Sequence, residues 1–212
     1  YEVTIPRAPE FRAGKISNIH ATVCSDSPEE IPIITPASGG IDLKYRWEMS
    51  NDGGSTWTVV DGVNAETFTP DLPASDDTYD FRRIVIGSGC EIPVEQYSEN
   101  IYHLDVVPVP SASVSSSHNA LCTDESNGSA TIGISSGTAP FKIKWDGGDA
   151  LNVTGNSYTK NDLSVGSHTI EVIDAHGCTA ETAVTISNPS APLTVSVTSP
   201  LSISSTFYTS PS

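Results

Sequence analysis

HTIEVID, residues 168–174, is the stretch that most clearly indicates the fold class of this chain. Its side chains alternate in direction: Ile170 and Val172 point to one side, whereas Thr169, Glu171 and Ile173 point to the other. A period of two is the pattern of a β-strand that buries one face. Short runs of this kind continue in both directions, and no stretch of ten or more residues has helical periodicity. The sequence therefore predicts an all-β protein.

Turn residues separate the expected strands at regular spacing. Examples are SGG at 38–40, NDGG at 51–54 and GSG at 87–89, whose glycines suit tight turns. About seven short strands with turns between them are typical of a β-sandwich. The expected strands of the first half are 15–19, 31–34, 43–49, 56–60, 67–69, 79–86 and 97–107, and those of the second half are 112–115, 130–135, 141–145, 157–159, 168–173 and 179–187.

Three proline-ended segments divide the chain into modules. They read VTIPRAP at 3–9, VVPVP at 106–110 and VTISNPSAP at 184–192. Proline cannot continue a central strand, so each segment predicts the end of a last strand followed by a stiff linker. We therefore expect two sandwich modules, at residues 13–107 and 108–189.

The two ends of the chain are expected to belong to neighbouring modules. Residues 1–12 predict the end strand of a preceding module and a linker. Residues 190–212 contain LTVSVT at 193–198, which predicts a linker and the first strand of a following module. The alternative is a donor strand that completes the sheet of another subunit. The chain is thus interpreted as part of a tandem array.

Acidic residues dominate the charge of the chain. Its 212 residues include 26 Asp and Glu against 10 Lys and Arg, a formal net charge of −16. Nucleic-acid binders use basic groups to neutralise phosphates, so this composition argues against nucleic acid as a partner. No apolar run approaches the roughly 18 residues that a membrane span needs, so we expect no membrane insertion.

The four cysteines are Cys24, Cys90, Cys122 and Cys178, and none is part of a C-x-x-C pair. A structural zinc site therefore has no scaffold. Four cysteines allow three pairings, and the module boundaries favour Cys24 with Cys90 and Cys122 with Cys178. Disulfides are favoured over four buried thiols in a reducing compartment, because the low Lys content, the high Ser and Thr content and the modular β pattern indicate an extracellular protein.

Each expected module has one tryptophan where a sandwich needs a central anchor. Trp47 lies in the run YRWEM and Trp145 in FKIKW. A buried Trp near a disulfide between the sheets is an immunoglobulin-like (Ig-like) arrangement. Tyr79 follows the turn LPASDD and predicts a tyrosine corner, while Cys90 would pin the next hairpin to the first strand. We therefore expect tandem Ig-like β-sandwich modules.

The second module closely resembles the SprB-type repeat, which occurs in giant surface proteins of Bacteroidetes and is named for a gliding-motility adhesin. The segments that carry the resemblance are CTDESNGSATI, GTAPFKIKW and LSVGSHTIEVIDAHGC. The matching residues are Cys122, Asn127, Gly128, Gly137, Pro140, Phe141, Trp145, Leu163, Gly166, Asp174, Gly177 and Cys178. His168 departs from the family, which usually has Tyr at this position.

The first module is similar to the Ig-like or PKD-like modules of the same surface proteins. Its segments YRWEMSNDGGSTW and TYDFRRIVIGSGC carry this similarity. Together the two resemblances cover residues 13–189. They imply a secreted protein, exported by type IX secretion, on the bacterial cell surface, and they identify no ligand.

The segment SNDGGSTW at 50–57 matches the Asp-box pattern S-x-D-x-G-x-T-W of sialidase-type propellers. In that pattern Asp52 accepts hydrogen bonds within a turn that contains Gly54, and Trp57 packs beneath it. Sialidases carry several copies and an arginine cluster, whereas this chain has one copy. We therefore interpret the segment as a structural turn and not as a catalytic site.

Acidic residues in the expected loops raise the question of calcium. The candidates are Asp76, Asp77, Asp124 and Asp146. Calcium takes six to eight oxygen ligands, and no EF-hand or other loop of fixed spacing is present. We favour the interpretation that these residues are solvated acids on an acidic surface. No cofactor is therefore expected, and calcium binding by these residues stays as the alternative.

No catalytic residues are expected. The histidines form no H-x-x-x-H or H-E-x-x-H pattern, and there is no G-x-S-x-G. Arg82 and Arg83 are adjacent, so one of them must face inward or lie on an edge, as part of a salt bridge or an anion contact. Trp57, Asn64 and Tyr158 are candidates for a sugar-binding surface.

These observations predict a non-catalytic stalk or spacer of a large bacterial cell-surface adhesin or filament, used in gliding motility or surface attachment. Its partners would be the neighbouring modules of the same array. The alternative is a ligand-binding module that recognises a polysaccharide or a partner protein. A more distant alternative is an accessory region of a secreted enzyme.

Overall fold

Every regular element that the computed structural model describes is a β-strand. The described residues are 10–71, 73, 76–88, 93–121 and 126–188. None of these segments forms a helix with the length and apolarity that a membrane span requires. The all-β class predicted from the alternation of side chains is confirmed.

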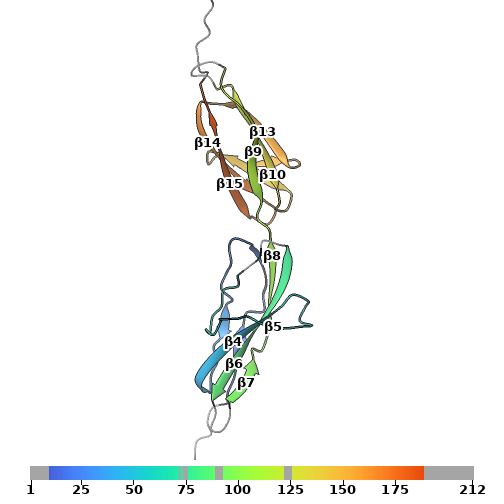
Figure 1. Ribbon diagram of the computed structural model, residues 1–212, viewed down its shortest axis with the longest axis vertical. Coiled ribbons are helices and arrows are strands. Elements are labelled where there is room, and N and C mark those ends of the chain that lie inside the picture. The colour runs from blue at the N-terminus through green and yellow to red at the C-terminus, as the bar shows by residue number, and fades with distance from the viewer. Residues whose placement is uncertain (1–9, 72, 74–75, 89–92, 122–125, 189–212) are drawn as a thin grey trace, which may run out of the picture.

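The strands fall into two modules (Figure 1), which we name module one and module two. Module one contains β1 (Lys15–Ile16), β2 (His20–Cys24), β3 (Ile33–Thr35), β4 (Ile41–Ser50), β5 (Thr58–Val59), β6 (Asp77–Ser88), β7 (Pro93–Tyr97) and β8 (Tyr102–Val107). Its main sheet has the order β2-β8-β6-β4-β5, and β7 pairs with the far half of β6. β1 and β3 form a separate two-stranded sheet. All of these pairs are antiparallel except β2 with β8, which is parallel.

Trp47 lies at the centre of the core of module one and is fully buried. Its Nε1 donates to the carbonyl oxygen of Ala65 at 3.1 Å, and its ring centroid lies 5.5 Å from that of Phe68. Tyr79 and Phe81 on β6 point into the same core. An alternating strand thus supplies one buried face, as its sequence pattern requires.

Module two is a sandwich of two sheets. Its strands are β9 (Ser111–His118), β10 (Gly128–Ser135), β11 (Phe141–Trp145), β12 (Leu151–Val153), β13 (Ser157–Leu163), β14 (Gly166–Ile173) and β15 (Thr179–Ile186). One sheet has the order β13-β10-β9 and the other β12-β11-β14-β15. Trp145 is buried between them with Ile132, Ile143 and Ile170. In β14 the alternate residues Ile170 and Val172 are buried, as expected.

The strand predictions were wrong at five places. β2, β7 and β12 were not expected, and residues 67–69 form no strand. The single strand expected at 97–107 is broken at 98–101, because β7 and β8 pair with different halves of β6. These differences depend on which strands become neighbours, which short-range pattern does not specify.

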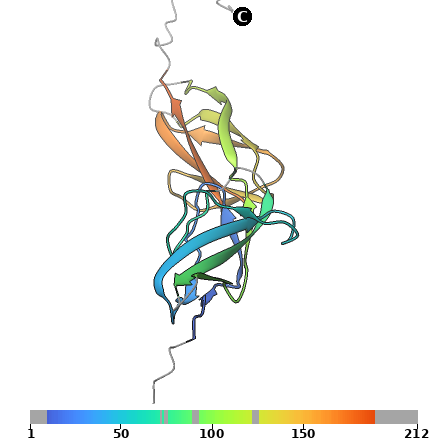
Figure 2. The same cartoon turned by 60° about the horizontal axis from the view of Figure 1, so that its bottom comes forward.

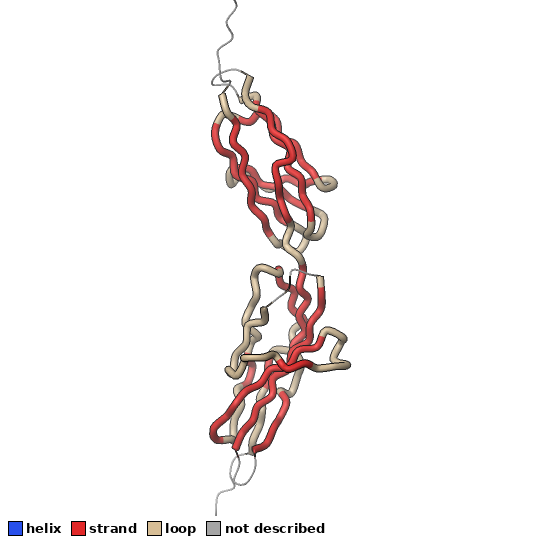
Figure 3. Tube along the Cα trace, in the orientation of Figure 1, coloured by secondary structure: helices blue, strands red, loops and turns tan. Residues whose placement is uncertain are grey.

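The two modules lie end to end (Figures 1 and 2), joined by the short segment 108–110 between β8 and β9. Loops lie at the ends of the strands and also along the sides of both modules (Figure 3). Phe11 lies against Gly87 at the end of module one far from the junction. In module two, Ser187 donates to Asn119, just beyond the far end of β9. The described chain therefore enters at one end of the pair and leaves at the other.

Candidate functional site: a doubly linked junction

A disulfide joins the two modules at their junction. It links Cys24 to Cys178, with a Cα–Cα distance of 5.7 Å and a sequence separation of 154 residues. The pairing expected from the module boundaries, Cys24 with Cys90 and Cys122 with Cys178, is therefore wrong for both described cysteines. Cys90 and Cys122 lie outside the described residues. The expectation that Cys90 pins its hairpin to the first strand through Cys24 is wrong as well, because Cys24 is bonded to Cys178.

Strand β2 positions Cys24. The strand runs parallel to β8, with His20 opposite His103 and Cys24 opposite Val107. The amide of Ser25 then donates to the carbonyl oxygen of Val107 at 2.9 Å. Cys24 is therefore held beside the last residue of β8, where the chain leaves module one.

The turn after β14 positions Cys178. The buried carboxylate of Asp174 accepts hydrogen bonds from the amides of His176 and Cys178, both at 2.9 Å. It also accepts one from the amide of Thr138 at 3.0 Å, which ties a second loop to the turn. Gly177 has φ of 87°, a conformation that favours glycine. The sequence DAHGC thus places a buried cysteine at the end of module two that faces module one.

The linker itself packs against module two. Ser136 Oγ donates to the carbonyl oxygen of Val109 at 2.9 Å. Gly137 has φ of 73°, and a Cβ there would lie 2.9 Å from the Cα of Pro110. The modules are consequently joined by two covalent links, the main chain and the disulfide, and by this packed turn.

An acidic hollow of about 460 Å³ lies at the junction. Module one contributes Asp76, Asp77 and Asp105 to its lining, and module two contributes Thr138 and His176. Thr78 Oγ1 donates to Asp105 at 2.8 Å and His20 is paired with it at 2.9 Å, and these contacts, led by the His20 hydrogen bond, lower the pKa of Asp105.

The other calcium candidates do not join this hollow. Asp146 lies on the turn after β11 and is bonded to His168, while Asp124 is outside the described residues. Across the described residues, no group of three or more His, Cys, Asp or Glu is arranged to hold a metal ion.

The Asp-box segment forms a self-contained hairpin turn between β4 and β5. Asp52 accepts hydrogen bonds from the amide of Thr56 at 2.8 Å and from its hydroxyl at 2.6 Å. These contacts, with another from Ser50, lower the pKa of Asp52 to about 2. Trp57 Nε1 donates to the carbonyl oxygen of Gly54 at 3.0 Å, which closes the turn. The geometry is that of the structural turn we expected.

Arg82 and Arg83 occupy opposite faces of β6. Arg83 is fully buried, where its guanidinium donates to the carbonyl oxygen of Ala13 at 2.7 Å and pairs with Glu66 at 3.5 Å. Burial lowers the pKa of Arg83, and the carboxylate of Glu66 opposes this shift. Arg82 faces outward and donates to Glu48 at 2.7 Å. Salt bridges therefore account for both arginines.

The guanidinium of Arg82 lies between two aromatic rings. It is 4.1 Å from the centroid of Trp57 and 4.4 Å from that of Tyr97. Contacts of this kind between a cation and an aromatic face are attractive. Tyr97 is 53% exposed, so one aromatic of the stack faces solvent.

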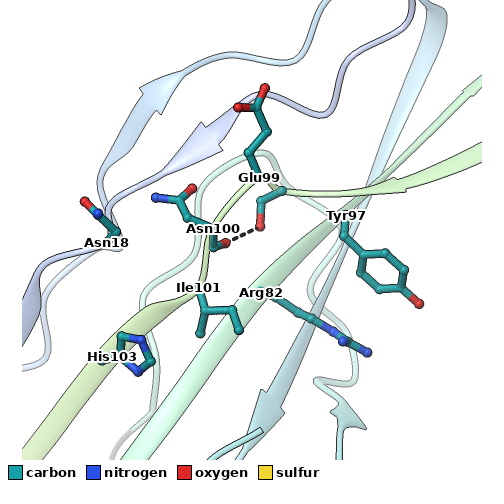
Figure 4. A pocket seen from close by; sticks show the side chains of 8 residues that line it. Asn18, Arg82, Tyr97, Glu99, Asn100, Ile101 and His103 are labelled. Atoms are coloured by element: carbon teal, nitrogen blue, oxygen red, sulfur yellow. Dashed lines mark hydrogen bonds between the residues drawn. The ribbon is translucent and has the colours of Figure 1, made fainter.

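A second hollow, of about 510 Å³, lies beside this stack (Figure 4). It forms at residues 98–101, between the end of β7 and the start of β8. Ser98 Oγ donates to the carbonyl oxygen of Asn100 at 2.8 Å, and Asn100 Nδ2 donates to that of Ile16 at 2.6 Å. Its lining residues are Asn18, Arg82, Tyr97, Ser98, Glu99, Asn100, Ile101 and His103.

Sequence reasoning missed this hollow because it expected one unbroken strand there. The proposed set of Trp57, Asn64 and Tyr158 does not form one surface. Tyr158 packs against the core of module two, whereas the other two residues are in module one.

His168 is accommodated by hydrogen bonds in place of the family's usual tyrosine. Its Nδ1 lies 2.7 Å from Asp146 Oδ2 and its Nε2 lies 2.9 Å from the carbonyl oxygen of Ser164. The bond to Asp146, followed by that to Ser164, raises the pKa of His168. Burial alone would raise the pKa of Asp146, but its hydrogen bonds from His168 and Thr169 outweigh burial and lower it.

Two families match consecutive parts of the chain. Residues 12–101 match a domain of unknown function, DUF8696. Residues 114–150 match the SprB repeat. The resemblance inferred from the residues of module two is thereby confirmed. The matched SprB segment contains β10 and β11 and ends before Asp174 and Cys178. A SprB repeat next to an Ig-like module fits a structural module of an adhesin-like surface protein.

Solved structures of tandem Ig and fibronectin domains are also similar to the chain that contains this SprB repeat. The FN1–FN3 domains of chicken CNTN1 match at 9% identity and TM-score 0.33, over 82% of this chain and 66% of that one. The four N-terminal Ig domains of Dscam1 isoform 7.44 match at 14% identity and TM-score 0.37, over 84% of this chain and 44% of that one. Because these TM-scores are low, the fold class rests on the strands and cores described above. No curated protein matches the sequence.

Proposed function

We propose that this segment is a non-catalytic stalk of a large bacterial cell-surface adhesin or filament, with the neighbouring modules of the array as its partners. The doubly linked junction carries the proposal. A single flexible linker would let two modules bend freely, whereas a second covalent link at the junction restrains that bending. The SprB repeat supports a surface location, and surface attachment or gliding motility is the setting we infer for it.

The acidic surface supports the same role. A formal net charge of −16 over the chain makes neighbouring stalks repel one another. Such repulsion limits lateral self-association and favours an extended array. The proposed function requires no cofactor.

The stalk proposal is tested by measuring binding and shape on the same purified chain. We expect no saturable binding on a panel of polysaccharides and glycans, with or without calcium, and an elongated monomeric particle in small-angle scattering. Saturable binding would overturn the pure stalk in favour of a ligand-binding module. Calcium dependence of that binding would direct attention to the acidic hollow at the junction.

The hollow beside Tyr97 favours a second candidate function, recognition of a sugar. An exposed aromatic ring offers an apolar face for a pyranose ring, and Asn18, Glu99 and Asn100 offer partners for its hydroxyl groups (Figure 4). We propose this as the alternative activity of the same segment, with a polysaccharide as the ligand.

The sugar hypothesis makes a distinct prediction on the same glycan panel. Any glycan bound through the hollow should be lost from Tyr97→Ala and retained by Val94→Ala, because Val94 is an exposed residue of the same strand that does not line the hollow. Equal binding by both variants would exclude this hollow as the site.

A further inference from the structure

We propose that the Cys24–Cys178 disulfide takes end-to-end tension off most of both modules, so that residues 25–177 lie outside the load-bearing path of the stalk. We call the removal of residues 25–177 from the load path the bypass. The biological role of this bypass rests on the proposed stalk function, whereas the bypass itself follows from the chain connectivity. In sequence, Cys24 is close to the first residue of module one and Cys178 is close to the last residue of module two, although the two cysteines meet at the junction in space. Everything between these points forms a closed covalent loop.

The load path follows three strands, β1, β2 and β15. A pull on the N-terminal side reaches Cys24 along β1 and β2, and β2 ends at the junction beside Val107. The force then crosses the disulfide to Cys178 and continues along β15, which ends at the far end of module two. The strands β3 to β14 are in the loop and are not in series with the pull.

The loop cannot lengthen the molecule even if both cores unfold. Between Cys24 and Cys178 the chain has two covalent routes, and the shorter one becomes taut first. That route spans 5.7 Å between the two Cα atoms. The longer route, through residues 25–177, stays slack at any extension that the disulfide survives.

The maximum end-to-end length differs greatly between the oxidised and the reduced chain. In the oxidised chain, the described residues in the path are 10–24 and 178–188, roughly 26 residues that extend to about 90 Å. In the reduced chain the path runs through residues 10–188, roughly 180 residues that extend to about 600 Å. The oxidised stalk is therefore a tether of nearly fixed maximum length, because β2 and β15 are already extended strands.

Tension can still break the hydrogen bonds between the strands of the load path and the strands of the closed loop. Hydrogen bonds of β1 to β3, of β2 to β8 and of β15 to β14 join the load path to the loop. A strong pull would shear these strands from their sheets. It would not separate β4 from β6, the longest pairing of module one, because neither strand is in the path.

Single-molecule stretching tests the proposal. The full chain is held by its two ends and extended in oxidising buffer, in reducing buffer, and as the double variant Cys24→Ser with Cys178→Ser. The chain beyond the described residues contributes equally in all three. We expect the reduced chain and the double variant to reach a contour length about 500 Å greater than the oxidised chain. A fully extended length does not depend on folding, so a variant that folds poorly still gives a valid reading.

Two results would overturn the bypass. One is an oxidised chain that extends as far as the reduced one. The other is an oxidised chain of intermediate length, because pairing of Cys24 with Cys90 and Cys122 with Cys178 would leave roughly 60 residues, about 200 Å, in the path. A matched control, Cys90→Ser with Cys122→Ser, should keep the short oxidised length.

The stretching result is independent of the ligand panel that tests the stalk. Saturable binding with a short oxidised length would reject the pure stalk and keep the bypass. No binding with a long oxidised length would keep the stalk and reject the bypass.

Discussion

At the scale of single residues, Asp174 holds together the turn that carries Cys178. Its carboxylate is buried and accepts three amide hydrogen bonds, two within its own turn and one from the loop at Thr138. Hydrogen bonds to a charged acceptor are stronger than neutral ones. One side chain thus fixes the backbone that presents Cys178 to module one.

Replacing Asp174 should destabilise module two. Asp174→Ala removes the acceptor of three amides, of which only that of Cys178 belongs to a buried residue. An unsatisfied buried group costs about 1–3 kcal/mol, so we expect a loss of roughly that size. Urea unfolding followed by the NMR amide signals of module two measures this loss. Asp149→Ala, at an exposed position of the same module, should have little effect. Equal stability of the two variants would contradict the role of Asp174.

The pair of His168 and Asp146 should make the stability of module two depend on pH. The raised pKa of His168 gives a stabilisation that is complete below pH 6.5 and is lost as the pH rises through the folded-state pKa. The lowered pKa of Asp146 gives a stabilisation that is present above pH 3.8 and is lost as the pH falls through its folded-state pKa. Module two is therefore most stable between these limits.

The expected result is an unfolding midpoint that declines as the pH is raised above 6.5, measured through the NMR amide signals of module two. His168→Gln removes the titrating group and should flatten that decline. His118→Gln, which replaces an exposed histidine of β9, should leave the decline unchanged. A wild-type midpoint that rises with pH over this range would contradict the assignment.

At the scale of elements, the turn between β10 and β11 packs against the linker that joins the two modules. It contacts the linker through Ser136 and Val109, and Gly137 approaches Pro110 too closely for a side chain. The linker is therefore held against module two and not free in solvent. β2 and β8 fix its other end by their parallel pairing.

The substitution Gly137→Ala should displace this turn from the linker. The added Cβ would overlap Pro110, so we expect a changed inter-module orientation in residual dipolar couplings. Gly147→Ala is the matched control, because Gly147 has φ of 71° but an added Cβ there would meet no atom within 4 Å. Both variants carry the same backbone penalty of about 1–2 kcal/mol. A shift in both, or in neither, would show that the contact with Pro110 does not set the orientation.

At the scale of the whole molecule, two covalent links turn a pair of modules into one extended unit. The main chain crosses the junction at 108–110 and the disulfide crosses it at Cys24–Cys178. Two attachment points remove bending freedom that one would leave. The same connectivity produces the proposed bypass of tension.

Reduction of the disulfide should uncouple the two modules without unfolding them. In the oxidised chain we expect one alignment tensor to fit the residual dipolar couplings of both modules. After reduction the two modules should require separate tensors of different magnitude, because only the linker contacts remain. A single tensor in both states would mean that the packed linker is sufficient for rigidity. The variant Cys90→Ser with Cys122→Ser should retain the single tensor.

Local interactions made much of the fold predictable. The alternation of Ile170 and Val172 identified β14, and the spacing of Asp52 and Trp57 identified the hairpin turn, because these patterns concern residues a few positions apart. The burial of Trp47 follows from its size and apolarity in an alternating strand. The SprB resemblance of module two was likewise carried by its residues alone.

Long-range neighbours explain what could not be predicted. The bond between Cys24 and Cys178 depends on the end-to-end placement of two modules, and four cysteines have no preference for a partner until the fold brings two of them together. The hollow at residues 97–101 depends on β6 accepting two different strands along one edge. Spacing and polarity specify which residues form strands and turns, whereas the distances that create a disulfide or a hollow exist only after those strands have packed.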